Sequence, residues 1–455
     1  MTLNLSAFKA YDVRGRIPDE INSELVYQVG RAYAAFIKPK TVCVGRDIRL
    51  TSEEFAQALI RGLTDAGVDV LDIGLCGTEG VYFATFYWKL DGGIMITASH
   101  NPPDYNGLKL VREQSKPVGS DTGLKDIAAL IASGKLPAPA AVKGKVTKLE
   151  TSKEYVDHLL GYVNRKSLRK LKVMVDAGNG GAGLSVDKLE PHLPFEFIKV
   201  RHEPNGKFPH GVPNPMIEES RVATIDAIRH HRADFGVAWD GDFDRCFLFD
   251  ETGAFIEGYY IVGLLASVFL KREPGANIVH DPRLTWATVD MVASLGGKAV
   301  MSRSGHAFMK DVMRESDAAY GGEMSAHHYF RRFGYCDSGQ IPWLLVAQIL
   351  CESGRSLSSL VSERIRLYPA SGEINRRVVD AAATIQQAQA VYGPQARAID
   401  FTDGLSIEFD AWRFNLRSSN TEPLIRLNVE SRADEALMRE KTDELLALIG
   451  GEVAH

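Results

Sequence analysis

Short apolar segments alternate with amphipathic segments over residues 22–96, and this alternation limits the fold more than any other feature. The apolar runs at 41–44 and 68–73 have the length and composition of buried strands. Residues 22–37 and 51–67 carry apolar side chains at helical spacing, and Thr51-Ser-Glu-Glu54 predicts a capping box at the start of the second helix. Strands interleaved with such helices predict an α/β domain with a largely parallel sheet.

Another buried-strand pattern, at residues 92–96, leads directly into Thr97-Ala-Ser-His-Asn-Pro102. Active loops of α/β sheets lie beyond the carboxyl ends of strands. Ser99 is therefore placed where a serine can carry a phosphoryl group or act as a nucleophile. The alternative is an ordinary turn in which Ser99 satisfies backbone groups. His100 is adjacent, and on an extended chain its ring points away from Ser99, so we expect it to shape the loop.

Three aspartates alternate in Asp240-Gly-Asp-Phe-Asp-Arg245, between strand-like segments at 235–239 and 246–249. Like charges this close repel one another unless a positive group lies among them. A divalent cation with oxygen ligands meets that need, whereas the alternative is a solvated acidic hairpin. An EF-hand loop is excluded because Arg245 stands where the sharp turn needs glycine and because the flanks are not helical.

Composition restricts the partners and the compartment. The 455 residues predict roughly three domains. A net charge of −5 leaves no basic surplus for nucleic acid. Five cysteines without a CxxC pair suit a reducing cytoplasm and argue against a structural zinc site. The first residues lack a signal pattern, and the longest apolar stretch, 259–270, is too short for a bilayer, so no membrane association is expected.

The pattern changes after about residue 370. Ile425, Leu427 and Val429 alternate with polar residues, and Asp403-Gly404 predicts a hairpin turn. Apolar residues at helical spacing over 437–449 predict a C-terminal helix. These signals predict a small α+β domain with an antiparallel sheet. The Pro- and Ala-rich segment 136–142 predicts a linker earlier in the chain.

Two other kinds of functional site do not match the motifs of this sequence. The glycine-rich segment 176–183 fits neither a dinucleotide-binding motif nor a P-loop, so we expect a tight strand-to-helix turn. The chain also lacks a G-x-S-x-G motif, which disfavours a serine hydrolase.

Four segments together, in this order, resemble the α-D-phosphohexomutase superfamily. They are the loops at 97–102 and 240–245, Glu323-Met-Ser325 and Arg417-Ser-Ser-Asn-Thr-Glu-Pro423. Members that act on amino sugars usually have Gln for Met324 and Gly for Asn420. The residues at these two positions therefore favour the bacterial phosphomannomutase/phosphoglucomutase branch. Ala326 stands where many relatives have Gly, which predicts a slightly different backbone path.

The resemblance implies three similar α/β domains with mixed sheets and a C-terminal antiparallel α+β domain, arranged around a central active-site cleft. The implied phosphoserine, metal-binding, sugar-binding and phosphate-binding domains cover 1–148, 149–254, 255–368 and 369–455.

The resemblance also implies roles for individual residues. The implied catalytic residues are Ser99, Lys109, His306 and Arg245. The implied Mg²⁺ ligands are Ser99, Asp240, Asp242 and Asp244. The implied substrate-binding residues are Tyr11, Arg14, Arg283, Glu323, Ser325, His327, Arg417, Ser419, Asn420 and Thr421. A lysine base would need a lowered pKa, and each histidine alone is more often structural. Arg426 either helps the phosphate loop or lies on an exposed strand face.

The implied enzyme is an intramolecular phosphotransferase that interconverts mannose 6-phosphate and mannose 1-phosphate. It would use a phosphoserine and a hexose 1,6-bisphosphate, accept glucose phosphates as well, and supply GDP-mannose for polysaccharide in the cytoplasm. The expected state is a monomer or weak homodimer. The alternatives are a phosphoglucomutase of the same branch and a metal-dependent sugar-phosphate phosphatase, which would release phosphate because it does not exclude water.

Overall fold

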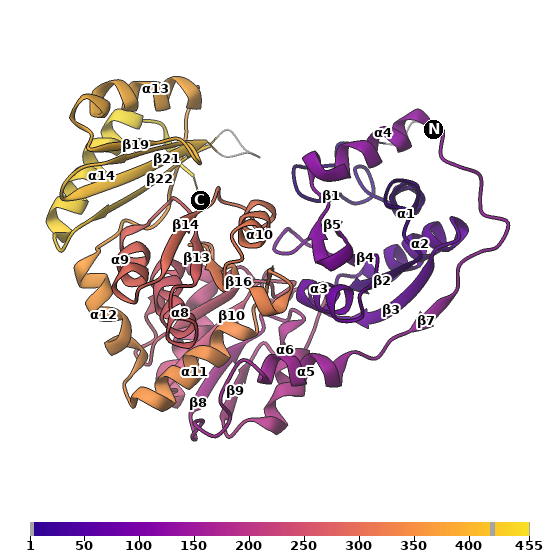
Figure 1. Ribbon diagram of the computed structural model, residues 1–455, viewed down its shortest axis with the longest axis horizontal. Coiled ribbons are helices and arrows are strands. Elements are labelled where there is room, and N and C mark those ends of the chain that lie inside the picture. The colour runs from indigo at the N-terminus through magenta and orange to yellow at the C-terminus, as the bar shows by residue number, and fades with distance from the viewer. Residues whose placement is uncertain (1–3, 419–423, 455) are drawn as a thin grey trace. The chain divides into compact units, whose positions relative to one another are not determined.

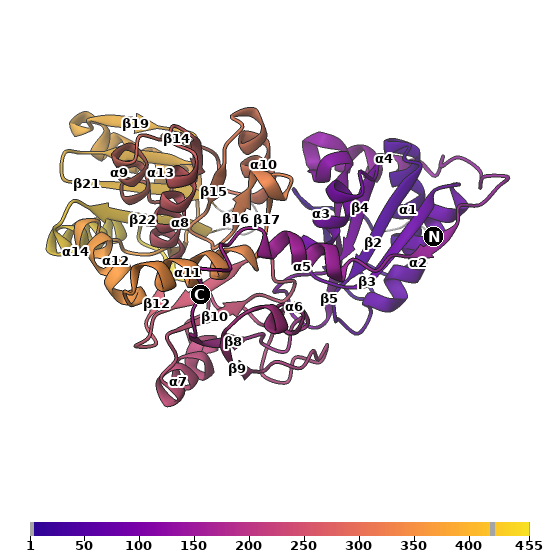
Figure 2. The same cartoon turned by 60° about the horizontal axis from the view of Figure 1, so that its bottom comes forward.

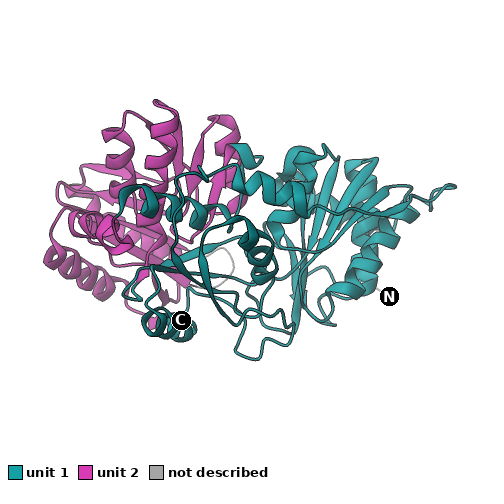
Figure 3. Ribbon diagram, turned by 90° about the horizontal axis from the view of Figure 1, so that it is seen from below, with its two compact units in different colours: residues 1–254, 332–354 teal, residues 255–331, 355–455 magenta. Residues whose placement is uncertain are grey.

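The structure, a computed structural model, describes residues 4–418 and 424–454. The chain divides into two compact units, which have different colours in Figure 3. The first unit contains Met1–Ala254 and Arg332–Gly354, and the second contains Phe255–Arg331 and Arg355–His455. Within the described ranges, no helix has both the length and the hydropathy of a bilayer span.

The first sheet has the strand order β1-β5-β4-β2-β3-β7, with β6 beside β5 (Figure 1). Strand β2 is parallel to β3 and β4, whereas β5 is antiparallel to β1 and β4, so the sheet is mixed. The strands are β1 Val13–Arg16, β2 Thr41–Arg46, β3 Asp69–Leu75, β4 Gly92–Ile96, β5 Tyr105–Arg112, β6 Lys116–Pro117 and β7 Val146–Lys148. The helices are α1 Ser23–Ile37, α2 Ser52–Asp65, α3 Thr78–Tyr87 and α4 Lys125–Ser133.

A continuous core lies between this sheet and helices α1, α2 and α4, and includes Val29, Leu59 and Ile94. Helix α3 packs against β2 and β4 from the other face (Figure 2). The predicted elements of this region are confirmed, but the predicted capping box is wrong. The side chain of Thr51 makes no cap hydrogen bond. Its hydroxyl instead accepts a hydrogen bond from the amide of Asn106, so a tertiary contact replaces the local one.

The second sheet of the first unit includes β11-β10-β8-β9 in that order. Its strands are β8 Lys172–Asp176, β9 Glu196–Val200, β10 Phe235–Trp239 and β11 Cys246–Phe249. The other elements of this part are α5 Ser152–Leu160, α6 Ala182–Leu189, α7 Val222–His231, β17 Cys336–Asp337 and α11 Ile341–Ser353. The two flanks of the acidic motif are the antiparallel strands β10 and β11, as predicted.

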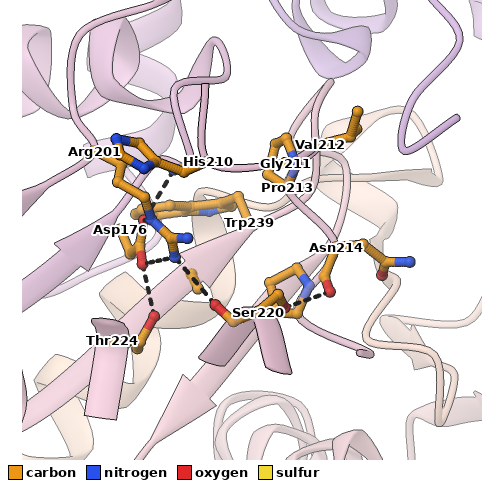
Figure 4. Close-up of a pocket in the computed structure, with 13 residues that line it drawn as sticks. Asp176, Arg201, His210, Gly211, Val212, Pro213, Asn214, Ser220, Thr224 and Trp239 are labelled. Carbon is orange, nitrogen blue, oxygen red and sulfur yellow. Dashed lines mark hydrogen bonds and ion pairs between the residues drawn. The ribbon is translucent and has the colours of Figure 1, made fainter. Parts of the chain in front are cut away.

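The glycine-rich segment joins β8 directly to α6, which confirms the predicted strand-to-helix turn. Figure 4 shows what fixes this turn: the carboxylate of Asp176 accepts hydrogen bonds from Arg201 and from the hydroxyl of Thr224. Its other bond comes from the backbone N–H of Gly178. Asp176 is buried, so these donors offset the loss of water around its charge. The motif is structural support for the second sheet.

Residues from the end of the first unit complete its interior. The buried carboxylate of Glu79, in α3, accepts hydrogen bonds from the backbone N–H of Gly339 and from the hydroxyl of Tyr155. The indole of Trp239 donates to the carbonyl of Gly339 at 2.8 Å. Burial raises the pKa of Glu79 to about 8. Residues 332–354 are therefore an integral part of the first unit.

The second unit holds the third and fourth sheets. The third includes β14-β13-β15-β16, with β13 parallel to β14 and β15 and with β16 antiparallel to β15. This part of the chain begins with the short strand β12 Phe255–Ile256, which is not in the third sheet. Its other elements are α8 Gly258–Arg272, β13 Asn277–His280, α9 Trp286–Ser294, β14 Lys298–Met301, α10 His306–Glu315, β15 Tyr320–Gly322, β16 His328–Phe330 and α12 Leu357–Leu367.

The fourth sheet has the order β19-β20-β21-β22-β18-β23, and every pair of neighbouring strands is antiparallel over the described residues. Its elements are β18 Ile374–Arg377, α13 Ala381–Tyr392, β19 Ala398–Asp400, β20 Leu405–Glu408, β21 Trp412–Ser418, β22 Leu424–Ser431, α14 Glu435–Ile449 and β23 Glu452–Val453. The predicted fold class, with mixed sheets followed by an antiparallel α+β domain, is confirmed. The four domain boundaries remain predictions.

Candidate active site

The loop between β4 and β5 holds Ser99 in an unusual backbone conformation, with a φ of +48°. Ser99 is 4% exposed, and its backbone N–H donates to the hydroxyl of Thr97. The guanidinium of Arg49 donates to the carbonyls of Ser99, Asn101 and Pro102 at 2.9, 2.6 and 2.8 Å. Because one rigid fork holds three carbonyls, the loop has a fixed shape in spite of its strained serine.

The serine loop and the acidic loop meet although they are far apart in the sequence. The hydroxyl of Ser99 donates to the carboxylate of Asp240 at 2.9 Å. A Cβ atom built on Gly241 would lie 2.3 Å from the carbonyl oxygen of Ser99. Only glycine therefore permits this approach of the two backbones. The two strongest sequence motifs form one site.

The carboxylates of Asp240, Asp242 and Asp244 offer oxygen atoms within 4.8 Å of one another, and all three residues are buried. Among the described residues, Oδ1 of Asp242 has no hydrogen-bond partner although it is buried. A buried carboxylate oxygen without a donor is costly, and a set of carboxylate oxygens suits a hard divalent cation. The donor set therefore fits the Mg²⁺ that the resemblance implies.

Two cations face these three carboxylates. The ammonium of Lys109 lies 2.7 Å from Asp242 and 2.6 Å from Asp244, and Arg245 lies 2.8 Å from Asp240. Burial alone would lower the pKa of Lys109, but the two aspartates outweigh it and raise that pKa. A lysine base needs the opposite shift. The contacts found here favour charge compensation for Lys109 and Arg245.

The expectation that the ring of His100 points away from Ser99 is wrong, whereas its expected role in shaping the loop stays a prediction. Its Nδ1 lies 3.1 Å from the hydroxyl of Ser99, because the left-handed backbone at Ser99 turns the next side chain back toward the serine. The guanidinium of Arg245 donates to the same nitrogen at 2.6 Å. Burial, followed by the charges of Arg245 and Arg14, lowers the pKa of His100 well below its usual value. A neutral His100 thus connects Ser99 with Arg245.

The N-terminal candidates lie beside this loop. Arg14, on β1, donates to the side-chain oxygen of Asn101 at 2.7 Å and pairs with Asp12. Tyr11 lies two residues before the start of β1 and is half-buried. Arg14 is thus brought to the serine loop by the pairing of β1 with β5.

Several predicted substrate-binding residues lie close together in the second unit. Arg283 lies 3.6 Å from a carboxylate oxygen of Glu323 and 3.4 Å from the hydroxyl of Ser325. Asp281 fixes this loop, because it pairs with Arg283 at 2.6 Å and accepts a hydrogen bond from the N–H of Met324 at 2.8 Å. The carboxylate of Glu323 also accepts from the N–H of Gly305. The predicted sugar-binding residues therefore do converge.

Other predicted residues of this unit lie nearby or at the next sheet. His306 begins α10, and its ring centre lies 6.5 Å from that of His327. Ala326 has a φ of +69°, the left-handed conformation that glycine favours. Arg417, at the end of β21, is buried and pairs with Glu373 at 3.0 Å. Ser419, Asn420 and Thr421 lie outside the described residues.

Four family models of phosphoglucomutase/phosphomannomutase together match most of the chain. Alpha/beta/alpha domains I, II and III match residues 5–137, 153–253 and 257–368, and the C-terminal domain matches residues 373–447. The chain belongs to the phosphoglucomutase/phosphomannomutase family. This membership confirms the predicted α-D-phosphohexomutase resemblance and the prediction of a phosphotransferase mutase.

Members of the family that are similar to this chain share its full length. A phosphomannomutase of Escherichia coli is 58% identical over 98% of this chain and 99% of its own. A protein of Xanthomonas campestris named phosphohexose mutases is 56% identical over 99% of this chain and 100% of its own. A solved phosphoglucomutase/phosphomannomutase family protein of Burkholderia thailandensis aligns with a TM-score of 0.89, at 29% identity and full coverage of both chains.

One residue of this phosphohexomutase site carried no local signal. Arg49 follows β2 at the carboxyl edge of the sheet and is only 4% exposed, yet a lone arginine in a loop fits no motif. Its place beyond a strand end, among the active loops, was the only signal available.

We expect Gly241→Ala to lower kcat by about 100-fold, because the added methyl group must push the acidic loop away from the serine loop and misplace the reacting groups. The matched control is Gly263→Ala in α8, where the nearest atom to an added Cβ lies 3.7 Å away. Steady-state kinetics of both variants, with circular dichroism to verify folding, measure the effect. Equal activity of the two variants would contradict the tight approach described above.

Proposed function

We propose that the protein interconverts mannose 6-phosphate and mannose 1-phosphate through phosphorylated Ser99 and a hexose 1,6-bisphosphate, and also acts on glucose phosphates. The observation that carries the proposal is the contact between the Ser99 hydroxyl and Asp240 inside a buried, oxygen-rich cluster. The full-length identity of 58% to a phosphomannomutase supports the choice of mannose.

Phosphoryl transfer leaves little covalent work to a protein beyond positioning and charge neutralisation. Ser99 would carry the phosphoryl group, and its P–O bond would break as a sugar hydroxyl forms a new bond to phosphorus. Asp240, Asp242 and Asp244, with an oxygen of the phosphoserine, would hold Mg²⁺, which supplies positive charge to the transferring group. Arg245 and Lys109 lie where they can neutralise the remaining charge.

The residues of the second unit would bind the sugar phosphate. Glu323 and Ser325 would accept and donate hydrogen bonds to sugar hydroxyls, and Arg417 would bind the phosphate that is not being transferred. His306 and His327 are the candidates for moving the hydroxyl proton. The intermediate must turn around before the second transfer, so the phosphate site has to accept either end of the sugar.

Solved structures with the same fold contain the molecules proposed here as cofactors, magnesium and a hexose 1,6-bisphosphate. An N-acetylphosphoglucosamine mutase of Aspergillus fumigatus has been solved with glucose 1,6-bisphosphate and, in another crystal, with a sugar phosphate and magnesium. These chains are 14% and 15% identical to this one. We further propose a cytoplasmic enzyme, since its five cysteines are free thiols, and a monomer or weak homodimer.

The test compares mannose, glucose and galactose 1-phosphates with catalytic bisphosphate present. Mannose and glucose differ only at carbon 2, so we expect kcat/KM values within roughly 10–200-fold of each other. Galactose inverts carbon 4 and would remove the hydrogen bond that the carbon-4 hydroxyl gives to the buried Glu323 carboxylate, at a cost of about 1–3 kcal/mol. Equal turnover of galactose 1-phosphate would contradict the role of Glu323, and stoichiometric release of inorganic phosphate would favour the phosphatase alternative.

A further inference from the structure

Three arginines of the second unit converge on the largely buried carboxylate of Glu373, which no sequence motif marked. One oxygen of Glu373 lies 3.0 Å from Arg417 and 3.6 Å from Arg283, and the other lies 3.1 Å from Arg426. The side chain of Glu373 is 11% exposed. Burial alone would raise the pKa of Glu373, but the three guanidinium groups outweigh it and lower that pKa. The carboxylate is therefore charged and held by several partners.

The strand pairing in the fourth sheet explains why a carboxylate is needed at this position. In the antiparallel pairing of β21 with β22, Arg417 lies directly opposite Arg426. Like charges directly opposite each other on neighbouring strands repel, and water screens the buried Arg417 poorly. Glu373 immediately precedes β18, the strand on the other side of β22. It can thus give one oxygen to each member of the arginine pair.

The arginines retain capacity for a second anion. Among the described residues, Nε of Arg417 and Nε of Arg283 have no hydrogen-bond partner although both atoms are buried. Buried donors of this kind are normally satisfied. An anionic group of the substrate would satisfy them, whereas Glu373 already uses both of its oxygens on other guanidinium nitrogens.

We propose that Glu373 is a positioning residue that holds the guanidinium of Arg417 in place for the phosphate of the substrate. Its negative charge opposes phosphate binding, but the three arginines outweigh it, and the orientation of Arg417 is fixed before the substrate arrives. Pre-organisation of this kind strengthens binding because less freedom is lost on association. The inference rests on the proposed function in taking a sugar phosphate as the anion.

The experiment measures binding by calorimetry in the Ser99→Ala background, which cannot transfer a phosphoryl group. Glu373→Gln should raise the Kd of mannose 1-phosphate about tenfold, the loss expected for one hydrogen bond to a charged group. In an Arg417→Ala background the same change should alter Kd less than about twofold, because the guanidinium that Glu373 is proposed to position is gone. Glu373→Asp, which keeps the charge but shortens the side chain, should restore part of the affinity.

The matched control is Asp290→Asn. Asp290 pairs with Arg432 at 2.8 Å and accepts a hydrogen bond from Tyr368, all within the second unit, but it touches none of the three arginines. This control should leave Kd unchanged, and thermal unfolding of each variant verifies the fold. Unchanged or tighter binding by Glu373→Gln would overturn the proposal, as would a full tenfold effect that persists without Arg417.

A second probe separates this inference from the proposed function. Inorganic phosphate is titrated into the same variants, and Glu373→Gln should weaken its binding only when Arg417 is present. If the wild-type protein isomerises no sugar phosphate but this pattern holds, the proposed function fails and the positioning role stands. If isomerisation occurs but the pattern is absent for both probes, the positioning role fails.

Discussion

Ser99→Ala is expected to lower turnover by about 10⁴-fold or more, the scale of loss when a covalent carrier is removed. The reason is chemical: alanine has no oxygen to accept and return a phosphoryl group. The intact mass of the purified wild-type protein should exceed that of the variant by one phosphate beyond the difference in side chains. Coupled assays of mannose 1-phosphate and mass spectrometry measure both effects.

The control for this prediction is Ser133→Ala. Ser133 is an exposed residue at the end of α4, and its hydroxyl donates to the carbonyl of Leu130 in the same helix. Its loss should change neither the rate nor the phosphorylation. Full activity of Ser99→Ala, or a phosphate that remains on that variant, would assign the carrier role to another residue.

Asp242→Asn is expected to lower kcat by about 10³-fold and to weaken Mg²⁺ dependence, because it removes one ligand charge from the cluster. Asp242 is fully buried, and its Oδ2 accepts hydrogen bonds from Lys109 and Thr78, so the amide should keep the shape of the loop. The measurements are activity against Mg²⁺ concentration and direct Mn²⁺ binding.

Asp250→Asn provides the control for the acidic loop. Asp250 follows β11, is also buried, and accepts hydrogen bonds from Thr252 and Ala254 in the adjoining turn. That variant should retain its metal dependence. Wild-type activity that survives thorough chelation would mean that the acidic loop is structural.

Local patterns in the sequence predicted most of the framework, because strand and helix periods depend on neighbours along the chain. Strands β4 and β10 have the predicted bounds, and the acidic loop lies between the predicted strands. The errors arose where a distant residue decides the structure. Thr51 bonds to Asn106 instead of capping its helix, and the ring of His100 follows the left-handed backbone at Ser99.

The supporting residues of the site could not be predicted for a related reason. Arg49, Asp281 and Glu373 are single charged residues whose partners come from distant segments or from loop carbonyls. A charged residue in a loop has the same appearance whether it is solvated or buried. Only the fold shows which groups these three residues contact.

The first unit is built from two separate segments of the chain, and this has a consequence for synthesis of the protein on the ribosome. Glu79 is bonded to the backbone of Gly339, and helix α11 belongs to the same unit, yet residues 255–331 must be translated first. At about 5–20 residues per second, residues 255–354 take roughly 5–20 s to appear. During that interval the nascent first unit has a buried carboxylate without its backbone donors. Co-translational folding of the first unit therefore ends with a late insertion of β17 and α11, after much of the second unit has already been made.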